Sequence, residues 1–269
     1  AVSKDQFTSP KEKKEKRPSI AKPPVKKQET SNTSYQFATY MVEIPSRGLV
    51  YPEGHSLHNI ESVEMKHMTA KEEDILTSPS LLRTGKAVNR VIQSCLVKPS
   101  RLDVDSMLVG DRNALLLALR ISGYGAEYKV QLASDDTGES YEYTFDLSTV
   151  EYKYLKSKPV EQFQNAFKVN LPISKIAVIF RLLTVGDEAK LTSQLEKLKK
   201  ITKLEKNVTT RLESQIIAVN GDTDPMGVKQ FVENMPVQDS RALRSKYAEI
   251  MPDVDMTQWI TDPTTGEEV

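Results

Sequence analysis

Apolar and polar positions alternate near the start of the sequence. One alternating run contains Phe37, Tyr40, Val42 and Ile44, and a second run covers residues 60–68. Two short segments that contain proline and glycine separate the runs, which is typical of turns. Alternation with a period of two is the pattern of a half-buried strand. The pattern therefore predicts a pair of N-terminal strands.

The spacing then changes to that of helices. Thr69 and Glu72 form a capping box, in which a hydroxyl and a carboxylate satisfy free amides at a helix start, and a short helix is expected to follow. Ser78 and Pro79 indicate the start of a second helix. Apolar residues recur at helical spacing from there to Cys95, so Cys95 is expected on the packing face of that helix.

The middle of the chain contains one strongly apolar helix and then several strands. The segment Leu115–Ile121 is apolar on most of its circumference, so it is expected to be the most buried helix. Gly123 and Gly125 are expected to end it. Because the strands follow one another with turn-forming residues between them, we expect an antiparallel β meander. The strand-like runs lie at residues 128–133, 141–147, 150–155, 163–171 and 176–183.

The segment 188–219 has an apolar residue every three or four positions. Nine such residues are separated by eight steps that cover 28 residues (219 − 191), a mean spacing of 3.5, which is the repeat of a coiled coil. Two interpretations are open: a long amphipathic helix that lies on its own domain, or a helix that packs on another subunit. The nine residues are Leu191, Leu195, Leu198, Ile201, Leu204, Val208, Leu212, Ile216 and Val219.

The C-terminal part is expected to be mainly helical. Helices are expected at Met226–Asn234 and, after an N-cap at Asp239, at Ser240–Ile250, with a short strand at Asp255–Ile260. Strands and helices come in runs, which indicates an α+β fold with an N-terminal strand pair, a small helical core, an antiparallel meander, a long amphipathic helix and a helical C-terminal part. The expected division is a disordered-type basic arm (1–35), an α+β core domain with antiparallel hairpins (36–186), the long helix (187–220) and a small helical region with a terminal strand and turn (221–269).

The overall charge is balanced, but the balance hides unlike parts. The 269 residues include 37 Lys and Arg and 37 Asp and Glu. Residues 1–35 carry nine basic and four acidic side chains, a net charge of +5, whereas residues 221–269 carry four basic and ten acidic ones, a net charge of −6. A neutral total argues against a dedicated nucleic-acid-binding protein, because such proteins have a basic excess.

No pattern of an enzyme, metal site or membrane span stands out. The sequence has no phosphate-binding glycine loop, nucleophile elbow or zinc-protease helix, so no catalytic residue and no cofactor is expected. His55 and His58 have a spacing that could share a metal, but solvated turn histidines are the favoured interpretation. The single cysteine, Cys95, is expected to be an inert core thiol. The longest apolar run, 176–185, is too short to span a bilayer.

Several ordered motifs resemble one family. They are Ile44-Pro-Ser-Arg-Gly-Leu-Val-Tyr-Pro-Glu-Gly54, Met68-Thr-Ala-Lys-Glu-Glu-Asp-Ile-Leu76, Leu81-Leu-Arg-Thr-Gly-Lys-Ala87, the segment Met107–Gly125 and the segment Phe231–Asp255. Together they make the chain similar to the baseplate hub assembly proteins of T4-like contractile-tailed bacteriophages. The resemblance implies a non-enzymatic tail component that is made in the host cytoplasm, resides in the tail baseplate of the virion and has other hub and tail proteins as partners.

The resemblance also bears on two short turns. Ser134–Glu139 and Asp262–Glu267 share the ending Thr-Gly-Glu, and the resemblance implies that several relatives carry Cys-x-x-Cys-Gly at these places. Hydroxyl and carboxylate side chains do not reproduce a thiolate zinc site. We therefore expect both turns to close without metal.

Three functional hypotheses follow. The first is a structural subunit of the baseplate hub, with a homo-oligomer as one possibility. The second is a transient assembly chaperone for a tail protein such as the tape-measure protein, and the third is a nucleic-acid-binding adaptor that uses the basic arm. The candidate partner-binding residues are Lys11, Lys13, Lys14, Lys16, Arg17, Leu191, Leu195, Leu198, Leu204, Val208, Leu212 and Ile216.

Overall fold

The expected N-terminal strand pair is confirmed, and a third strand extends it. In the computed structural model, which describes residues 38–134, 138–161, 164–202, 207–258, 260 and 266, the first sheet has the order β1–β2–β3 and is antiparallel. The basic arm, residues 1–35, lies outside the described residues. The strands are β1 (Thr39–Glu43), β2 (Ser62–Lys66) and β3 (Leu96–Lys98).

Three short helices connect β2 to β3, where the sequence predicted two. The capping box is confirmed at the start of α1, with Glu72 accepting a hydrogen bond from the backbone amide of Thr69 at 2.9 Å. The second predicted helix is divided because Gly85 has a φ of +67°, a left-handed conformation that interrupts a helix. Cys95 is fully buried, as expected. The helices are α1 (Ala70–Thr77), α2 (Pro79–Arg83) and α3 (Ala87–Cys95).

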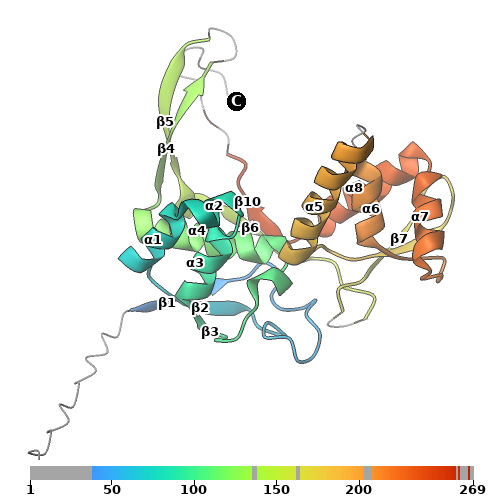
Figure 1. Ribbon diagram of the computed structural model, residues 1–269, viewed down its shortest axis with the longest axis horizontal. Helices are drawn as coiled ribbons and strands as arrows, with labels where there is room; N and C mark the ends of the chain where they lie inside the picture. The colour runs from blue at the N-terminus through green and yellow to red at the C-terminus, as the bar shows by residue number, and fades with distance from the viewer. Residues whose placement is uncertain are drawn as a thin grey trace, which may run out of the picture. The chain divides into compact units, whose positions relative to one another are not determined.

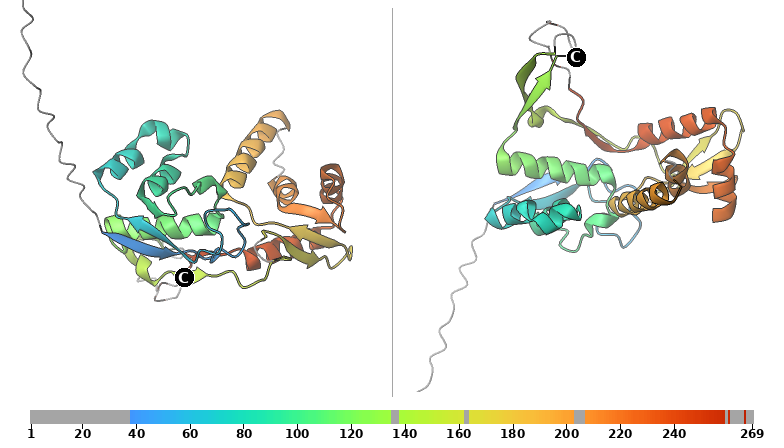
Figure 2. Two further views of the ribbon diagram at one scale, coloured as in Figure 1. Left: turned by 90° about the horizontal axis from the view of Figure 1, so that it is seen from below. Right: turned by 45° about the horizontal axis from the view of Figure 1, so that its top comes forward.

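The predicted apolar helix is α4 (Val109–Tyr124), which follows a short 3-10 helix, η1 (Val104–Ser106). It contacts β1 and α3 (Figures 1 and 2). Leu115 and Leu119 are buried in a core that also contains Val63 and Met65 from β2. One side of α4 remains in solvent, since Leu116 is 37% exposed. The helix ends at Gly125, as predicted.

The strands that follow α4 are antiparallel, but they do not form one meander. The hairpin of β4 (Glu127–Ala133) and β5 (Ser140–Asp146) is a separate two-stranded sheet. After the 3-10 helix η2 (Leu147–Thr149), β6 (Glu151–Lys153) pairs with the distant β10 (Asp253–Asp255). A second hairpin joins β7 (Phe167–Asn170) and β8 (Ala177–Phe180). The α+β class is thus confirmed, and within the described residues the strands are divided among four small sheets.

The prediction of a single long helix over 187–220 is wrong. The segment forms α5 (Val185–Thr202), α6 (Asn207–Gln215) and a strand, β9 (Ile216–Val219), while residues 203–206 lie outside the described part. β9 pairs antiparallel with β8 and completes the sheet β7–β8–β9. The reason is tertiary: Ile216 and Ala218 alternate into the core with a period of two, which only a strand allows.

Two predictions about the C-terminal part need correction. The helices are α7 (Pro225–Glu233) and α8 (Val237–Ile250), but the N-cap of α8 is Pro236. Asp239 lies inside the first turn, where its carboxylate accepts hydrogen bonds from the amides of Ile173 (2.7 Å) and Ser174 (2.9 Å). It therefore fastens the β7–β8 turn to α8. The terminal strand is β10, which ends where the predicted strand, Asp255–Ile260, begins.

A buried carboxyl group joins the N-terminal sheet to the start of α4. Asp111, which is not exposed at all, accepts hydrogen bonds from the Ser46 amide (2.9 Å), the Ser46 hydroxyl (2.6 Å) and the Tyr51 hydroxyl (2.6 Å). The Tyr51 oxygen in turn accepts one from the Leu108 amide at 2.8 Å. Burial raises the pKa of Asp111, and the hydrogen bonds from Ser46 and Tyr51 oppose that rise.

We expect Tyr51→Phe to lower the free energy of unfolding by about 1–3 kcal/mol, because it leaves the Leu108 amide and one Asp111 oxygen buried without this partner. Urea denaturation followed by circular dichroism measures the change. Tyr154→Phe is the matched control, since the Tyr154 hydroxyl donates to Glu43 at an exposed site. If both variants lose the same free energy of unfolding, the buried network does not contribute more to stability than an exposed hydrogen bond.

A second prediction concerns Glu72. Burial alone raises its pKa, but hydrogen bonds from Ser94, Thr69 and Lys66 outweigh this effect and lower the pKa from 4.5 to about 2. A lowered folded-state pKa stabilises the protein above the unfolded value, and this contribution is lost as the pH falls from about 4.5 to about 2. Glu72→Gln should therefore reduce the acid sensitivity of stability in that interval. The comparison requires urea unfolding of both proteins across this range, and parallel pH curves would refute the expectation.

Candidate functional site

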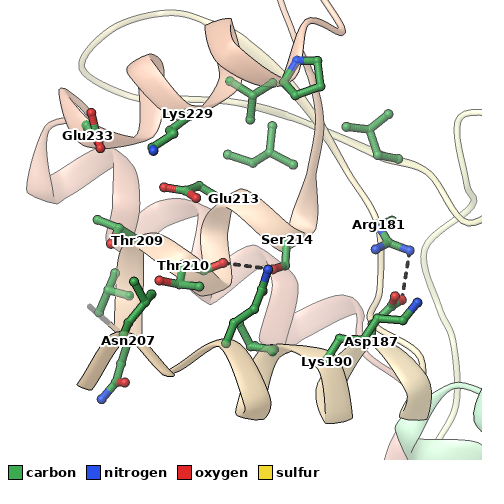
Figure 3. Close-up of a pocket in the computed structure, with 18 of the residues that line it drawn as sticks. Arg181, Asp187, Lys190, Asn207, Thr209, Thr210, Glu213, Ser214, Lys229 and Glu233 are labelled. Atoms are coloured by element: carbon green, nitrogen blue, oxygen red, sulfur yellow. Dashed lines mark hydrogen bonds and ion pairs between the residues drawn. The ribbon is translucent and has the colours of Figure 1, made fainter. Parts of the chain in front are cut away.

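A large groove lies between α5, α6 and α7 (Figure 3). Its volume is about 1710 Å³. The apolar side chains at its base are buried: Leu191 is 1%, Ile216 7% and Val228 6% exposed. Val208, on α6, is 45% exposed at the wall. The groove is therefore an apolar channel with an open, partly polar rim.

The start of α5 is fixed by a local polar cluster. The Asp187 carboxylate accepts hydrogen bonds from the Thr184 amide (3.2 Å) and from the Arg181 guanidinium (2.9 Å), and the Thr184 hydroxyl accepts one from the Asp187 amide (3.2 Å). Burial alone raises the pKa of Asp187, but these bonds outweigh it and lower the pKa. The Arg181–Asp187 pair lies at one end of the groove (Figure 3).

An ion pair holds α5 against α6. The two guanidinium nitrogens of Arg211 donate to the two carboxylate oxygens of Glu188, at 2.6 and 3.0 Å. Such a two-pronged pair fixes relative orientation as well as distance. Leu212, one residue further along α6, is 2% exposed in the core. This contact sets the spacing of the first two walls of the groove.

The third wall, α7, begins at a well-formed N-cap. The Asp224 carboxylate accepts a hydrogen bond from the Gly227 amide at 3.0 Å, and Pro225 occupies the first helical position. A short turn after β9 leads directly into this cap, and α7 contacts both α6 and β9. The strand that the sequence pattern missed is thus the element that positions α7 beside the groove.

Within the described part of the chain, four of the predicted partner-binding residues line the groove: Leu191, Leu198, Val208 and Ile216. Leu212 lies in the core instead, and the half-buried Leu195 does not line the groove. The remaining ones, Leu204 and the basic Lys11, Lys13, Lys14, Lys16 and Arg17, lie outside the described residues. The contribution of α7 could not be predicted, because no residue pattern within 188–219 indicates a contact with residues 225–233.

The comparison with family models is decisive about the kind of protein. A model of the T4 bacteriophage base plate protein family matches residues 38–269. The chain belongs to this family. It is a structural component of a phage tail baseplate, as the resemblance predicted. Comparisons with curated proteins and with solved structures gave no match.

The other candidate sites of this baseplate protein have structural explanations. His55 stacks on Tyr51 with ring centroids 4.4 Å apart, and its two ring nitrogens contact the Ser106 hydroxyl (2.9 Å) and the Leu57 amide (3.1 Å). His58 contacts the Tyr51 carbonyl at 2.9 Å. Among the described residues there is no group of three or more potential metal ligands. The histidines therefore fasten a turn.

Cys95 is a buried thiol, and the first Thr-Gly-Glu turn closes through a backbone hydrogen bond. Burial, reinforced by the nearby Glu72 charge, raises the pKa of Cys95 to about 11, so the thiol is protonated at neutral pH. At the first turn of the baseplate protein, the Ser134 amide donates to the Glu139 carbonyl at 2.9 Å. The second turn, Asp262–Glu267, lies almost wholly outside the described residues. In the described ranges, no helix has the length and apolarity needed to cross a membrane.

We expect Glu188→Gln to weaken the attachment of α5 to α6 in this baseplate protein. The pair is partly exposed, with 29% of the Glu188 and 43% of the Arg211 side chain accessible, so screening by solvent limits its contribution to about 0.5–1 kcal/mol. A double-mutant cycle with Arg211→Gln, read from urea unfolding, isolates the coupling. Additive effects of the two substitutions would contradict a direct interaction.

Proposed function

We propose that the protein is a structural subunit of the baseplate hub and binds other tail proteins through the groove between α5, α6 and α7. Family membership supports a baseplate role. The groove supports binding, because residues that the sequence pattern singled out for partner contact converge there with α7. An apolar channel of this kind on a protein surface is typical of an interaction site.

The position of the apolar residues is the observation that carries this proposal. Val208 is almost half exposed on the groove wall, while the neighbouring Leu212 on the same helix is buried in the core. The two residues are four positions apart and therefore share one face of α6. That face is covered by the core at Leu212 and left open in the first turn at Val208, where it lines the groove. The open end of this face is the part available to a partner.

The transient chaperone is the alternative that the same groove allows, since a chaperone would also hold an apolar segment of a tail protein. The two functions differ in whether the protein stays in the finished particle. The third hypothesis, a nucleic-acid-binding adaptor, rests on the basic arm. No contact among the described residues favours it.

Quantitative mass spectrometry of purified tails tests the proposal. A structural subunit should be present at a whole number of copies per symmetric position of the baseplate, as other structural proteins in the same sample are. The tape-measure protein and the tail tube protein provide internal standards for particle purity. Absence of the protein, or a level far below one copy per position, would reject the structural role in favour of the chaperone.

A further inference from the structure

We propose that the groove binds one amphipathic α-helix of another tail protein, and that acidic residues flank the apolar stripe of that helix. This inference rests on the proposed function, because it names the partner for the same site. Three observations lead to it: the size of the groove, the chemistry of its base and the charge of its rim.

The size of the groove favours a segment of protein. At about 1710 Å³, its volume exceeds the roughly 300–1,000 Å³ of most small-molecule sites. The longest wall, α5, has 18 residues, which corresponds to about 27 Å at about 1.5 Å per residue. A partner helix of four to five turns would have a similar length. Amphipathic helices commonly bind in grooves formed by other helices.

The base of the groove favours the apolar face of a helix. Leu191, Ile216 and Val228 form the floor, and Leu198 and Val208 extend the apolar surface up the walls. No aromatic side chain is found among the groove-lining residues in the described part of the chain. Because single-stranded nucleic acids bind largely by stacking on aromatic rings and by phosphate contacts, this base disfavours such a ligand.

The rim carries an excess of positive charge. Lys190 and Lys197 on α5 and Lys229 on α7 line the groove and are exposed, and none has an ion-pair partner within the described ranges. On the acidic side, Asp187 is paired with Arg181, and Glu213 and Glu233 offset two of the three lysines. The described lining residues thus include four basic and three acidic side chains, a net charge of 4 − 3 = +1.

This charge selects between candidate occupants. The basic arm of a second copy has a net charge of +5 in residues 1–35, so the lysines of the rim would repel it. A helix with acidic flanks would form ion pairs with the same lysines while its apolar stripe covers the floor. Charge complementarity of this kind determines which partner is accepted and how fast it associates.

Two synthetic peptides test the inference with the full-length protein. Both are 18-residue helices with the same leucine stripe, and they differ only in whether glutamate or lysine flanks the stripe. In fluorescence anisotropy at low salt we expect the glutamate peptide to bind about tenfold more tightly, since several exposed ion pairs each contribute about 0.2–1 kcal/mol. The difference should shrink as ionic strength rises from about 0.05 to about 0.5 M.

Charge reversal provides the decisive variant. Lys190→Glu, Lys197→Glu and Lys229→Glu together should reverse the preference, so that the lysine peptide binds more tightly. The matched control reverses Lys71, Lys86 and Lys168, which do not line the groove, and should keep the original preference. Val208→Asp should weaken both peptides, whereas Val160→Asp, at an exposed valine outside the groove, should weaken neither.

The outcomes separate this inference from the proposed function. Binding of neither peptide, equal binding of both, or the same response in the control variant overturns the acidic-helix inference. If the protein is nevertheless present in purified tails at whole-number stoichiometry, the structural role stands without this groove. If the protein is absent from tails but discriminates the peptides as expected, the groove stands and the role is that of a chaperone.

Discussion

The fold depends on one buried carboxyl group. Asp111 holds the turn after β1 through Ser46 and Tyr51, and it lies in the first turn of α4, a helix that also contacts β10. At the neighbouring Gly110, any side chain would collide with the backbone of Pro252, since a Cβ would lie 1.8 Å from its carbonyl oxygen. A buried polar network whose members are all hydrogen-bonded rigidifies its surroundings and specifies one arrangement of the core. The turn after β1 and the segment that leads into β10 therefore meet at the first turn of α4.

The sequence predicted those features whose cause is local. The capping box of Thr69 and Glu72, the end of α4 at Gly125 and the hairpin of β4 and β5 each depend on residues within a few positions of one another. Helix caps, turns and alternating patterns act over that range. The burial of Cys95 followed in the same way from helical spacing.

Features that depend on distant contacts could not be predicted. Ile216 continues the 3.5-residue spacing of the preceding helices, yet it belongs to β9 because β8, some forty residues earlier in the chain, offers an open edge. Asp239 reads as an N-cap by residue type, but its partners lie on the β7–β8 turn. The groove could be predicted only in part. The spacing identified several of its apolar residues, whereas α7 and the unpaired lysines join the site through tertiary contacts.

The pairing of β6 with β10 affects the order in which the parts of the chain fold during synthesis. β10 contacts α4 and forms a sheet with β6, about one hundred residues earlier. During synthesis, proteins emerge and fold from the N-terminal side at about 5–20 residues per second. The surface of α4 around Gly110 and one edge of β6 therefore stay uncovered until residue 255 has left the ribosome. A polypeptide that ends before that point exposes both, so only copies that include β10 present a finished surface to an assembling tail.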